Sequence, residues 1–267
     1  MILAVVNNKG GVGKTTTAVN LGAALCAPAR RVLLVDLDSQ ASASRWCGVR
    51  GSRLKASSAS VLLHDFPIEQ AIRTTSTQGL DILPGSLELA NADLALSDIK
   101  GRETTLKHAL APVRRTYGTV VLDCPPNFSL VGVNALVAAD GVVVPVTPHP
   151  LAVEGLGPLV SSIETARRRF GSPGRLLGIL ITMSASGGRE TRAVADRLRA
   201  AYRDHVFDTQ IHMSPALRDA PAAGQTVFSF SPRSNAASAY RRLAAEVLER
   251  FGRTQRRRGR PPFLGVE

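Results

Sequence analysis

The sequence predicts an α/β fold, in which a mostly parallel, twisted sheet is covered by helices on both faces. Two observations indicate it. Short continuous runs of Val, Ile and Leu alternate with helical patterns almost to the end of the chain, and residues typical of ligand binding follow several of these runs. Continuous apolar runs are typical of strands that are buried on both faces. With 267 residues, 44% of them hydrophobic, the chain is long enough for one large domain.

Each element follows from this alternation. The strands are expected at residues 2–7, 31–36, 80–84, 119–123, 141–146, 177–182 and 206–211. The helices are expected at residues 15–27, 87–98, 102–117, 129–138, 153–170, 190–204 and 235–251. Residues 45–78 are less regular and rich in serine, which favours a surface excursion with short helices. We therefore expect one domain over residues 1–251, followed by a basic, extended or flexible tail over residues 252–267.

The first expected strand runs directly into a glycine-rich loop, Asn8-Lys-Gly-Gly-Val-Gly-Lys-Thr-Thr16, and a helical pattern follows. This context is typical of a phosphate-binding loop (P-loop), because glycines allow backbone N–H groups to converge on phosphate oxygens at a helix N-terminus. Lys14 would reach the β- and γ-phosphates, the Thr15 hydroxyl would bind Mg²⁺, and Thr16 would lie near the α-phosphate. The alternative is a glycine turn that only links strand to helix. The candidate nucleotide-binding residues here are Lys9, Gly10, Gly11, Val12, Gly13, Lys14, Thr15 and Thr16.

The usual pattern, G-x-x-x-x-G-K-[ST], has glycine where this chain has Asn8, and Lys9 is an additional basic residue. The form K-G-G-x-G-K-T-T resembles the deviant Walker A motif of the ParA/MinD superfamily of P-loop NTPases, and within it the ParA/Soj-type partition ATPases. The resemblance covers residues 1–251. It implies that Lys9 is catalytic together with Lys14, that Lys9 reaches the partner's phosphates across a nucleotide-sandwiched dimer, and that ATP controls dimerisation. The alternative for Lys9 is a solvated loop lysine.

Acidic residues end two of the other expected strands. Strand 31–36 leads into Asp36-Leu-Asp38, and strand 119–123 ends at Asp123. Because the C-terminal ends of parallel strands form the ligand crevice, these carboxylates should lie near the nucleotide. Asp123 has the Walker B position and would hold Mg²⁺.

These two segments also resemble the switch regions of the same family. Val35-Asp-Leu-Asp-Ser-Gln40 resembles the V-D-x-D-P-Q of switch I, and Asp123-Cys-Pro-Pro126 resembles the D-x-P-P of switch II. The resemblance implies that Asp38 orients the attacking water and that Asp36 supports Mg²⁺. Ser39 stands where the family usually has proline. A helix N-cap formed by Asp38 or Ser39 remains open.

Candidate contacts to the base lie further along the chain. Ile211-His-Met213 stands where the family has I-P-R, whose proline lies near adenine, so His212 is expected either to stack on the base or to be a polar surface residue. With Met183, His212 and Met213 are the candidate adenine contacts. His149 replaces a family glutamate at the dimer interface, whereas Glu154 is retained.

The chain is strongly basic, with 33 Lys and Arg residues against 21 Asp and Glu residues. Without residues 252–267 there remain 28 basic and 20 acidic residues, a net charge of +8, so the body is basic too. A polyanion other than ATP is therefore an expected partner. Family members that bind DNA have one arginine where this chain has Ala216 and another where it has Gly187. The candidate DNA-binding residues, each of which could instead be a solvated surface arginine, are Arg189, Arg218, Arg253, Arg256, Arg257, Arg258 and Arg260.

The resemblance implies an ATPase with ATP and Mg²⁺ as cofactors that dimerises, binds DNA non-specifically in its ATP state, and partitions a plasmid, a chromosome or another cargo. Expected partners are DNA, a second copy of the chain, and a ParB-like or cargo adaptor protein that stimulates a weak basal hydrolysis. The alternative is a MinD-like membrane-associated regulator, but the arginine-rich tail with its Pro261-Pro262 pair does not favour an amphipathic membrane helix. The sequence shows no signal peptide, no transmembrane-length run and no metal-binding cysteine spacing, so we expect a cytoplasmic protein. The family resemblance implies that it is also nucleoid-associated.

Overall fold

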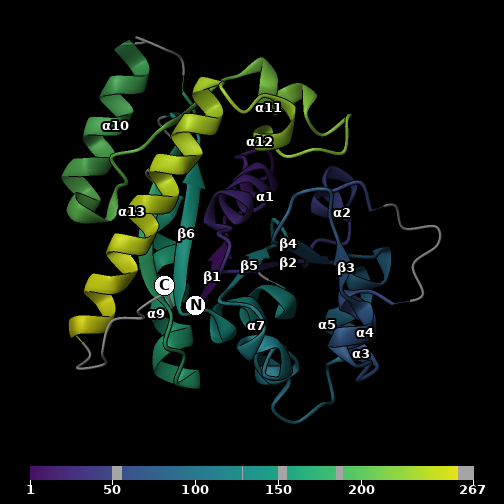
Figure 1. Cartoon of the computed structure of the whole chain (residues 1–267). Helices are drawn as coiled ribbons and strands as arrows, with labels where there is room; N and C mark the ends of the chain where they lie inside the picture. Colours follow the sequence, from purple (N-terminus) through teal and green to yellow (C-terminus); the bar gives the residue numbers. More distant parts are fainter. Residues whose placement is uncertain (50–55, 128, 150–154, 185–188, 258–267) are drawn as a thin grey trace.

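The computed structural model describes residues 1–49, 56–127, 129–149, 155–184 and 189–257. Over these residues the fold centres on an eight-stranded sheet with the strand order β3-β4-β2-β5-β1-β6-β7-β8 (Figure 1). Only β3 is antiparallel to its neighbour; the other strand pairings are parallel. The strands are β1 (Ile2–Val5), β2 (Val32–Asp36), β3 (Arg73–Thr74), β4 (Leu80–Leu83), β5 (Thr119–Asp123), β6 (Gly141–Val146), β7 (Arg175–Ser184) and β8 (Ile211–His212). The predicted α/β class is confirmed.

Helices cover both faces of this sheet. The α-helices are α1 (Lys14–Leu25), α2 (Ser42–Trp46), α3 (Ser58–Leu63), α4 (Ile68–Ala71), α5 (Ala92–Ala95), α6 (Thr105–Ala109), α7 (Leu130–Ala138), α9 (Leu156–Phe170), α10 (Arg189–Tyr202), α11 (Pro215–Asp219), α12 (Val227–Phe230) and α13 (Asn235–Arg257). Short 3₁₀ helices are η2 (Leu87–Asn91), η3 (Arg102–Thr104), η4 (Pro112–Arg115) and η5 (Arg203–His205).

Alternate residues of the central strand β1 point into two separate cores. Ile2 and Ala4 belong to a core that includes residues of α3, α7, α9 and α10. Leu3 and Val5 belong to a second core, formed with α1 and α13. Because both faces are covered, all four residues of β1 are buried, which explains why the sequence of this strand is continuously apolar.

The strand order brings the ends of β2, β5 and β1 together. Val5 at the end of β1 is in register with Asp123 at the end of β5, and Asp123 is in register with Asp36 at the end of β2. The loop after β1 is the predicted P-loop. Three sequence-distant segments with polar residues therefore meet at one edge of the sheet.

Two expected helices are broken into shorter pieces. The expected helix 102–117 consists of η3, α6 and η4, because Pro112 cannot donate a backbone hydrogen bond inside a helix and begins a new 3₁₀ turn. The expected helix 87–98 consists of η2 followed by the single turn of α5. Of the expected helix 153–170, residues 153–154 lie outside the described residues, and α9 covers the rest from Leu156.

The described part of residues 45–78 contains the predicted short helices, but it is not only a surface excursion. Side chains such as Ala59, Leu62, Ile68 and Ala71 are buried in the core beneath the sheet. The segment also adds the edge strand β3, which was not expected. Serine-rich composition therefore concealed a set of buried apolar residues.

The last helix is longer than predicted. It was expected to end at Phe251, but α13 continues through Gly252 to Arg257. The Glu249–Arg253 ion pair, one turn apart, supports this extension across the glycine. Arg253, Arg256 and Arg257 are therefore helical rather than extended, whereas Arg258 and Arg260 lie outside the described residues. In the part of the chain that is described, no helix is both long and apolar enough to cross a membrane.

Candidate functional site

The predicted P-loop connects β1 to α1 at the centre of the sheet. Gly11 and Gly13 have positive φ angles of 71° and 83°, a conformation that glycine adopts without steric cost. Gly13 is the N-cap of α1, and its carbonyl accepts a hydrogen bond from Thr17 N at 2.9 Å. The N-terminal turn of α1 therefore faces the cleft described below, and Gly10, Gly11, Gly13, Lys14, Thr15 and Thr16 line that cleft. Val12, between Gly11 and Gly13, is buried and does not line the cleft.

Hydrogen bonds to neighbouring strands fix this loop. The Asn7 side chain makes both bonds: its Nδ2 donates to Pro145 O on β6 at 2.7 Å, and its Oδ1 accepts from Lys9 N at 3.0 Å. The buried Thr182 hydroxyl on β7 lies 2.8 Å from Val12 O and 3.0 Å from Val146 O, and can donate to either carbonyl. The loop is thus held in a phosphate-binding shape by side chains that the sequence patterns did not single out.

The two lysines of the loop have different environments. Lys14 is buried and its ammonium donates to Lys9 O at 2.7 Å. Burial lowers the pKa of Lys14, and the negative charges of Asp123 and Asp38 oppose this effect. Lys9, by contrast, is exposed. Lys14 is therefore positioned inside the cleft, whereas Lys9 lies at the surface.

Asp36 is fully buried and held by backbone and side-chain donors. Its Oδ2 accepts from Ser44 N at 2.8 Å and from Ser44 Oγ at 2.7 Å, and its Oδ1 accepts from Asp38 N at 3.2 Å. Burial raises the pKa of Asp36 to about 6, although the Ser44 hydrogen bonds oppose the shift. Gly85 packs against this carboxyl so closely that a Cβ there would lie 2.9 Å from Asp36 Cγ.

Asp123 is also fully buried, but its two oxygens make no hydrogen bond to any described residue. Burial raises the pKa of Asp123 well above its usual value, and the neighbouring Asp36 adds to the shift. The nearby Thr15 and Lys14 side chains favour the charged carboxylate and so lower this pKa. Neither of them makes a hydrogen bond to Asp123 in the structure. A buried carboxylate without a partner is costly unless a cation or donor joins it.

Mg²⁺ fits this arrangement. It is commonly bound by one or two protein oxygen ligands together with substrate phosphates, and Asp123, Asp36 and Thr15 provide oxygens beside the P-loop. Within the described ranges, no group of three or more His, Cys, Asp or Glu side chains could hold a metal ion by itself. Phosphate oxygens would therefore have to complete the coordination.

A large cleft of about 1430 Å³ lies over the P-loop and the Asp36–Asp38 segment. Asp38 is partly exposed and lines the cleft, and its Oδ1 accepts from Gln40 N at 2.9 Å. The alternative that Asp38 or Ser39 caps a helix is wrong, because the N-cap of α2 is Ala41. The Asp38 carboxylate therefore has room for a ligand or a water molecule beside it.

The three candidate base contacts come together in a second pocket of about 480 Å³. Met183, His212 and Met213 line it with Gly13 and Thr16 of the P-loop region, so the two pockets meet at the start of α1. Met213 is 74% exposed, and Met183 has a positive φ of 52°. His212 Nδ1 lies 2.6 Å from the buried Ser184 hydroxyl, which restrains the ring. His212 is thus more than an isolated polar surface residue.

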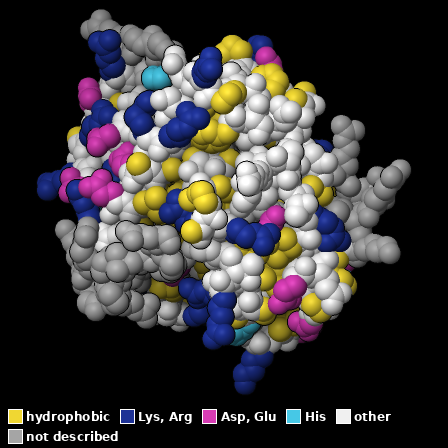
Figure 2. Space-filling model, in the orientation of Figure 1, with side chains coloured by type: hydrophobic (Ala, Val, Ile, Leu, Met, Phe, Trp, Pro, Cys, Tyr) yellow, Lys and Arg dark blue, Asp and Glu magenta, His cyan; other side chains and the backbone are white. Residues whose placement is uncertain are grey.

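Three of the candidate DNA-binding arginines that the structure describes lie on three different helices. Arg218 lies on α11 and pairs with Asp219 at 2.8 Å, whereas Arg253 lies near the end of α13 and pairs with Glu249. Arg189 begins α10. Figure 2 shows basic side chains in separate groups on this face, with acidic side chains interspersed over the α10 side. No continuous basic patch is visible in this view.

Several residues of the site were missed from sequence. Ser44 and Gly85 surround Asp36, and Gly85 N donates to Ser44 Oγ at 2.9 Å. Trp46 Nε1 donates to Gln225 O at 2.8 Å, which joins α2 to the loop whose Pro221 and Ala222 line the large cleft. A glycine directly after the 80–84 strand was the only available signal for Gly85. Nothing local predicts the Trp46 contact, since its partner is 179 residues away.

Comparisons with known proteins agree with this geometry. A family model described as an AAA domain matches residues 1–173. The chain is 36% identical to the sporulation initiation inhibitor protein Soj of Bacillus subtilis over 246 residues, which covers 92% of this chain and 97% of Soj. It is also 36% identical over 251 residues to the chromosome partitioning protein ParA of Caulobacter vibrioides, covering 93% of this chain and 94% of that protein.

This chain is also similar to a solved structure whose description names a different protein. That structure is described as cobyrinic acid a,c-diamide synthase from Mycobacterium smegmatis with bound ADP and magnesium. It superposes with a TM-score of 0.82 at 34% sequence identity, and the match covers 98% of both chains. The same protein with a bound ATP analogue and magnesium gives the same TM-score.

Proposed function

Because this chain belongs to the AAA-domain family of Soj- and ParA-type ATPases in the ParA/MinD superfamily, we propose that it is a partition ATPase. It binds ATP with Mg²⁺, dimerises in that state, binds DNA non-specifically, and hydrolyses ATP to ADP and phosphate while it positions a plasmid, a chromosome or another cargo. The observation that supports this proposal most strongly is the buried, unpartnered Asp123 carboxylate beside a P-loop lysine.

The P-loop binds the phosphates. The backbone N–H groups of the glycine-rich loop and of the first turn of α1 donate to the phosphate oxygens, and the helix N-terminus adds a favourable dipole. The Lys14 ammonium, which donates to Lys9 O in the structure, has further hydrogens for the β- and γ-phosphates. Thr16 lies one residue further along α1 than Thr15 and contacts the α-phosphate.

Asp123, Thr15 and Asp36 hold Mg²⁺. When bound, the ion supplies positive charge that offsets the charges of the β- and γ-phosphates. Asp123 makes no hydrogen bond to a described residue, so its carboxylate would bind the ion directly or through a water molecule. Asp36 is already engaged by Ser44, so it acts as a supporting negative charge behind Asp123.

Asp38 orients the attacking water. Its carboxylate lines the cleft, and Oδ1 is fixed by Gln40 N, so the other oxygen remains available to accept a hydrogen bond from water. Removal of a water-orienting group affects hydrolysis more than binding, since it does not contact the phosphates. Lys9 acts across the dimer on the partner's phosphates, which is consistent with its exposed side chain.

The adenine base occupies the smaller pocket between Met183, His212 and Met213. Two methionine side chains offer adaptable apolar contact area, and the His212 ring is held by Ser184. The pocket adjoins the start of α1, so a nucleotide whose phosphates lie on the P-loop can reach it.

DNA binding rests on the basic charge of the chain and on arginines in several places. Arg189, Arg218, Arg253, Arg256, Arg257, Arg258 and Arg260 are the proposed contacts. The ion pairs of Arg218 and Arg253 are exposed, and such pairs are weak enough to exchange for phosphate contacts. We place the active protein in the cytoplasm on the nucleoid, with a ParB-like or cargo adaptor that stimulates hydrolysis.

A paired binding experiment tests this function. DNA mobility shift and sedimentation with anionic liposomes should be run side by side with ATP, with ADP and without nucleotide, each with Mg²⁺. Retention on DNA only with ATP supports the partition ATPase. Sedimentation with liposomes in ATP, without DNA binding, would contradict it and favour the MinD-like membrane alternative. Lys14→Ala is the control that should bind neither surface.

A further inference from the structure

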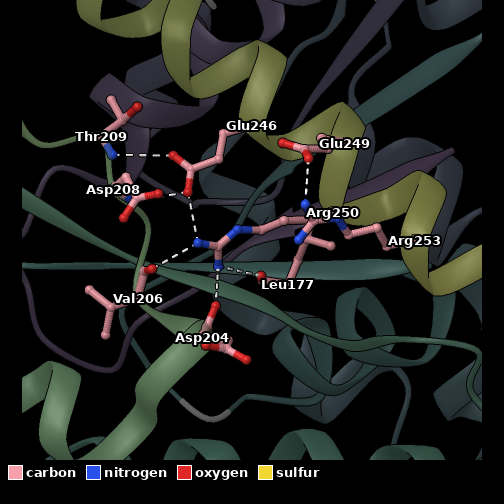
Figure 3. Close-up of polar contacts among 9 residues, drawn as sticks. All are labelled: Leu177, Asp204, Val206, Asp208, Thr209, Glu246, Glu249, Arg250 and Arg253. Carbon is pink, nitrogen blue, oxygen red and sulfur yellow. Dashed lines mark hydrogen bonds and ion pairs between the residues drawn. The ribbon is translucent and has the colours of Figure 1, made fainter.

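An ion pair on the last helix holds the chain segment that leads into one wall of the smaller pocket. Glu246 and Arg250 lie one turn apart on α13, and Arg250 Nη2 donates to Glu246 Oε1 at 2.7 Å (Figure 3). Their side chains are only 14% and 16% exposed. An ion pair this well enclosed must satisfy its remaining polar atoms within the protein.

Those remaining atoms bind the backbone of residues 204–209. Glu246 Oε1 accepts from Asp208 N at 2.9 Å, and Glu246 Oε2 accepts from Thr209 N at 3.2 Å. Arg250 donates to Asp204 O at 2.8 Å and to Val206 O at 2.7 Å. Figure 3 shows the two side chains reaching from α13 to this stretch of backbone. Side chains of the helix thus make backbone hydrogen bonds to this segment of the kind that a neighbouring strand makes in a sheet.

Packing fixes the same segment from the other side. The Phe207 ring is fully buried, and the Arg250 guanidinium lies 4.3 Å from the ring centroid. On β7, Gly178 makes room for this ring, because a Cβ there would lie 2.4 Å from Phe207 Cε2. Phe207 N also donates to Ile179 O at 2.9 Å. Residues 204–209 therefore have one defined position between β7 and α13.

The segment leads directly into the wall of the smaller pocket. Only Gln210 separates Thr209 from β8, and β8 pairs with β7 through Ile211 and His212. His212 and Met213 line the pocket opposite Gly13 and Thr16 of the P-loop region. A displacement of Thr209 would therefore move the pocket wall relative to the phosphate site.

We propose that Glu246 and Arg250 are positioning residues for the base end of the nucleotide site. They touch neither pocket, and they act through residues 204–213 by keeping His212 and Met213 in register with the P-loop. This inference rests on the proposed nucleotide site. If the pair has this role, its loss weakens the binding of the base and leaves the binding of the phosphates unchanged. A purely structural role would not produce this difference between the two ligand parts.

The experiment compares ATP with inorganic tripolyphosphate, which has the phosphates but no base. Dissociation constants of the full-length protein for both ligands, with Mg²⁺, are measured by calorimetry or competition. Glu246→Ala should weaken ATP binding by about tenfold, the effect of one or two hydrogen bonds. Its affinity for tripolyphosphate should stay within about twofold, since the P-loop is untouched. Glu246→Gln, which retains one acceptor oxygen, should give an intermediate loss.

Glu249→Ala is the matched control. It removes the exposed Glu249–Arg253 pair on the same helix, which makes no hydrogen bond or ion pair with residues 204–213 among the described residues, and it should bind both ligands as the wild type does. If Glu246→Ala does not fold, Arg250→Lys serves instead, because it keeps the charge but cannot reach the carbonyls of both Asp204 and Val206. Its expected pattern is the same selective loss of ATP affinity.

The outcomes are distinguishable. Equal weakening of both ligands in a folded Glu246 or Arg250 variant, or no weakening of either, would overturn the positioning role alone. A wild-type protein that binds ATP no more tightly than tripolyphosphate would contradict the base pocket itself, and with it the proposed nucleotide site and this inference.

Discussion

Asp36 and Asp123 are register partners at the ends of the neighbouring strands β2 and β5. Both side chains are fully buried, but their surroundings differ. The Asp36 carboxyl is bound by Ser44, whereas the Asp123 carboxyl makes no hydrogen bond to a described residue. Two adjacent buried carboxyls disfavour ionisation of both, and the pKa values of both are raised. A cation at Asp123 would remove this cost, so the protein without a bound cation should be less stable than the protein with one.

The first prediction concerns stability and pH. Asp123→Asn should raise the melting temperature of the ligand-free protein, because the amide does not ionise. A carboxyl whose folded-state pKa exceeds the unfolded value binds more protons when folded, so wild-type stability should fall as pH rises. The difference in melting temperature between variant and wild type should therefore grow from pH 5 to pH 8, as thermal denaturation in both buffers would reveal. A difference that shrinks over this range would contradict the prediction.

The same substitution should weaken function. Asp123→Asn should lose the part of ATP affinity that depends on Mg²⁺, because an amide is a poor ligand for this ion compared with a carboxylate. Calorimetric titration of ATP with Mg²⁺ and with EDTA measures this part directly. If Mg²⁺ increases ATP affinity equally in the variant and in the wild type, Asp123 does not hold the ion.

The two P-loop lysines should have separable roles. Lys14→Ala should abolish ATP binding, because the buried ammonium lies within the cleft. Lys9→Ala should keep ATP affinity within about threefold of wild type, since its side chain is exposed and exposed charges contribute little to binding within their own protomer. It should nevertheless prevent ATP-dependent dimerisation. Normal dimer formation by Lys9→Ala would rule out the action of this lysine across the dimer.

Asp38→Ala should form an ATP-bound state that hydrolyses slowly. Phosphate and Mg²⁺ contacts remain, whereas the water-orienting carboxylate is absent, and such groups contribute roughly 10²–10⁴ to a rate. Single-turnover hydrolysis should slow by at least about tenfold while ATP affinity is retained. Hydrolysis at the wild-type rate, with and without a stimulating partner, would show that Asp38 is not catalytic.

Trp46 is the single tryptophan of the chain, so its fluorescence reports on one place. It lies on α2, two residues after Ser44, and its indole donates to Gln225 O. Because α2 borders the cleft, ATP with Mg²⁺ should shift or quench the emission. Lys14→Ala should show no such change. Identical wild-type spectra with and without ATP, at a concentration where calorimetry shows binding, would contradict the predicted change in the surroundings of Trp46.

The arginines at the end of the chain should contribute to DNA affinity rather than to folding. Truncation after Arg257 keeps α13 intact and removes Arg258 and Arg260, so the melting temperature should not change. If each of these two arginines binds one DNA phosphate, the slope of log affinity against log salt should become shallower by about 0.9 per arginine, or up to about 1.8 per protomer. An unchanged salt slope in DNA titrations would leave the arginines that the truncation keeps as candidates, namely Arg189, Arg218, Arg253, Arg256 and Arg257.

Local sequence signals predicted the parts of the molecule that depend on local physics. The buried strands around the P-loop, α1 and the acidic strand ends were found, because apolar runs and glycine spacing are local patterns. Pro112 divides the expected helix 102–117, because it cannot donate a backbone hydrogen bond inside a helix and begins a new 3₁₀ turn. Gly252 does not end the last helix, because α13 continues through it to Arg257.

The remaining errors come from contacts between distant residues. The expected strand 206–211 pairs with β7 only around Val206 and again at Ile211, because the N–H groups of Asp208 and Thr209 donate to Glu246 on α13. The bonding of Asp36 to Ser44, the close approach of Gly85 and the contact of Trp46 with Gln225 likewise depend on the assembled fold. No local pattern in the sequence encodes these pairings.

The most direct test is the mass of the protein in each nucleotide state. Light scattering after size-exclusion chromatography should give a mass near the 28.3 kDa of one chain without nucleotide and with ADP. With Mg²⁺ and a non-hydrolysable ATP analogue, the mass should be about twice that of one chain, and Lys14→Ala should remain monomeric. The same single-chain mass in every state, in a wild-type sample that calorimetry shows to have bound the analogue, would contradict ATP-dependent dimerisation.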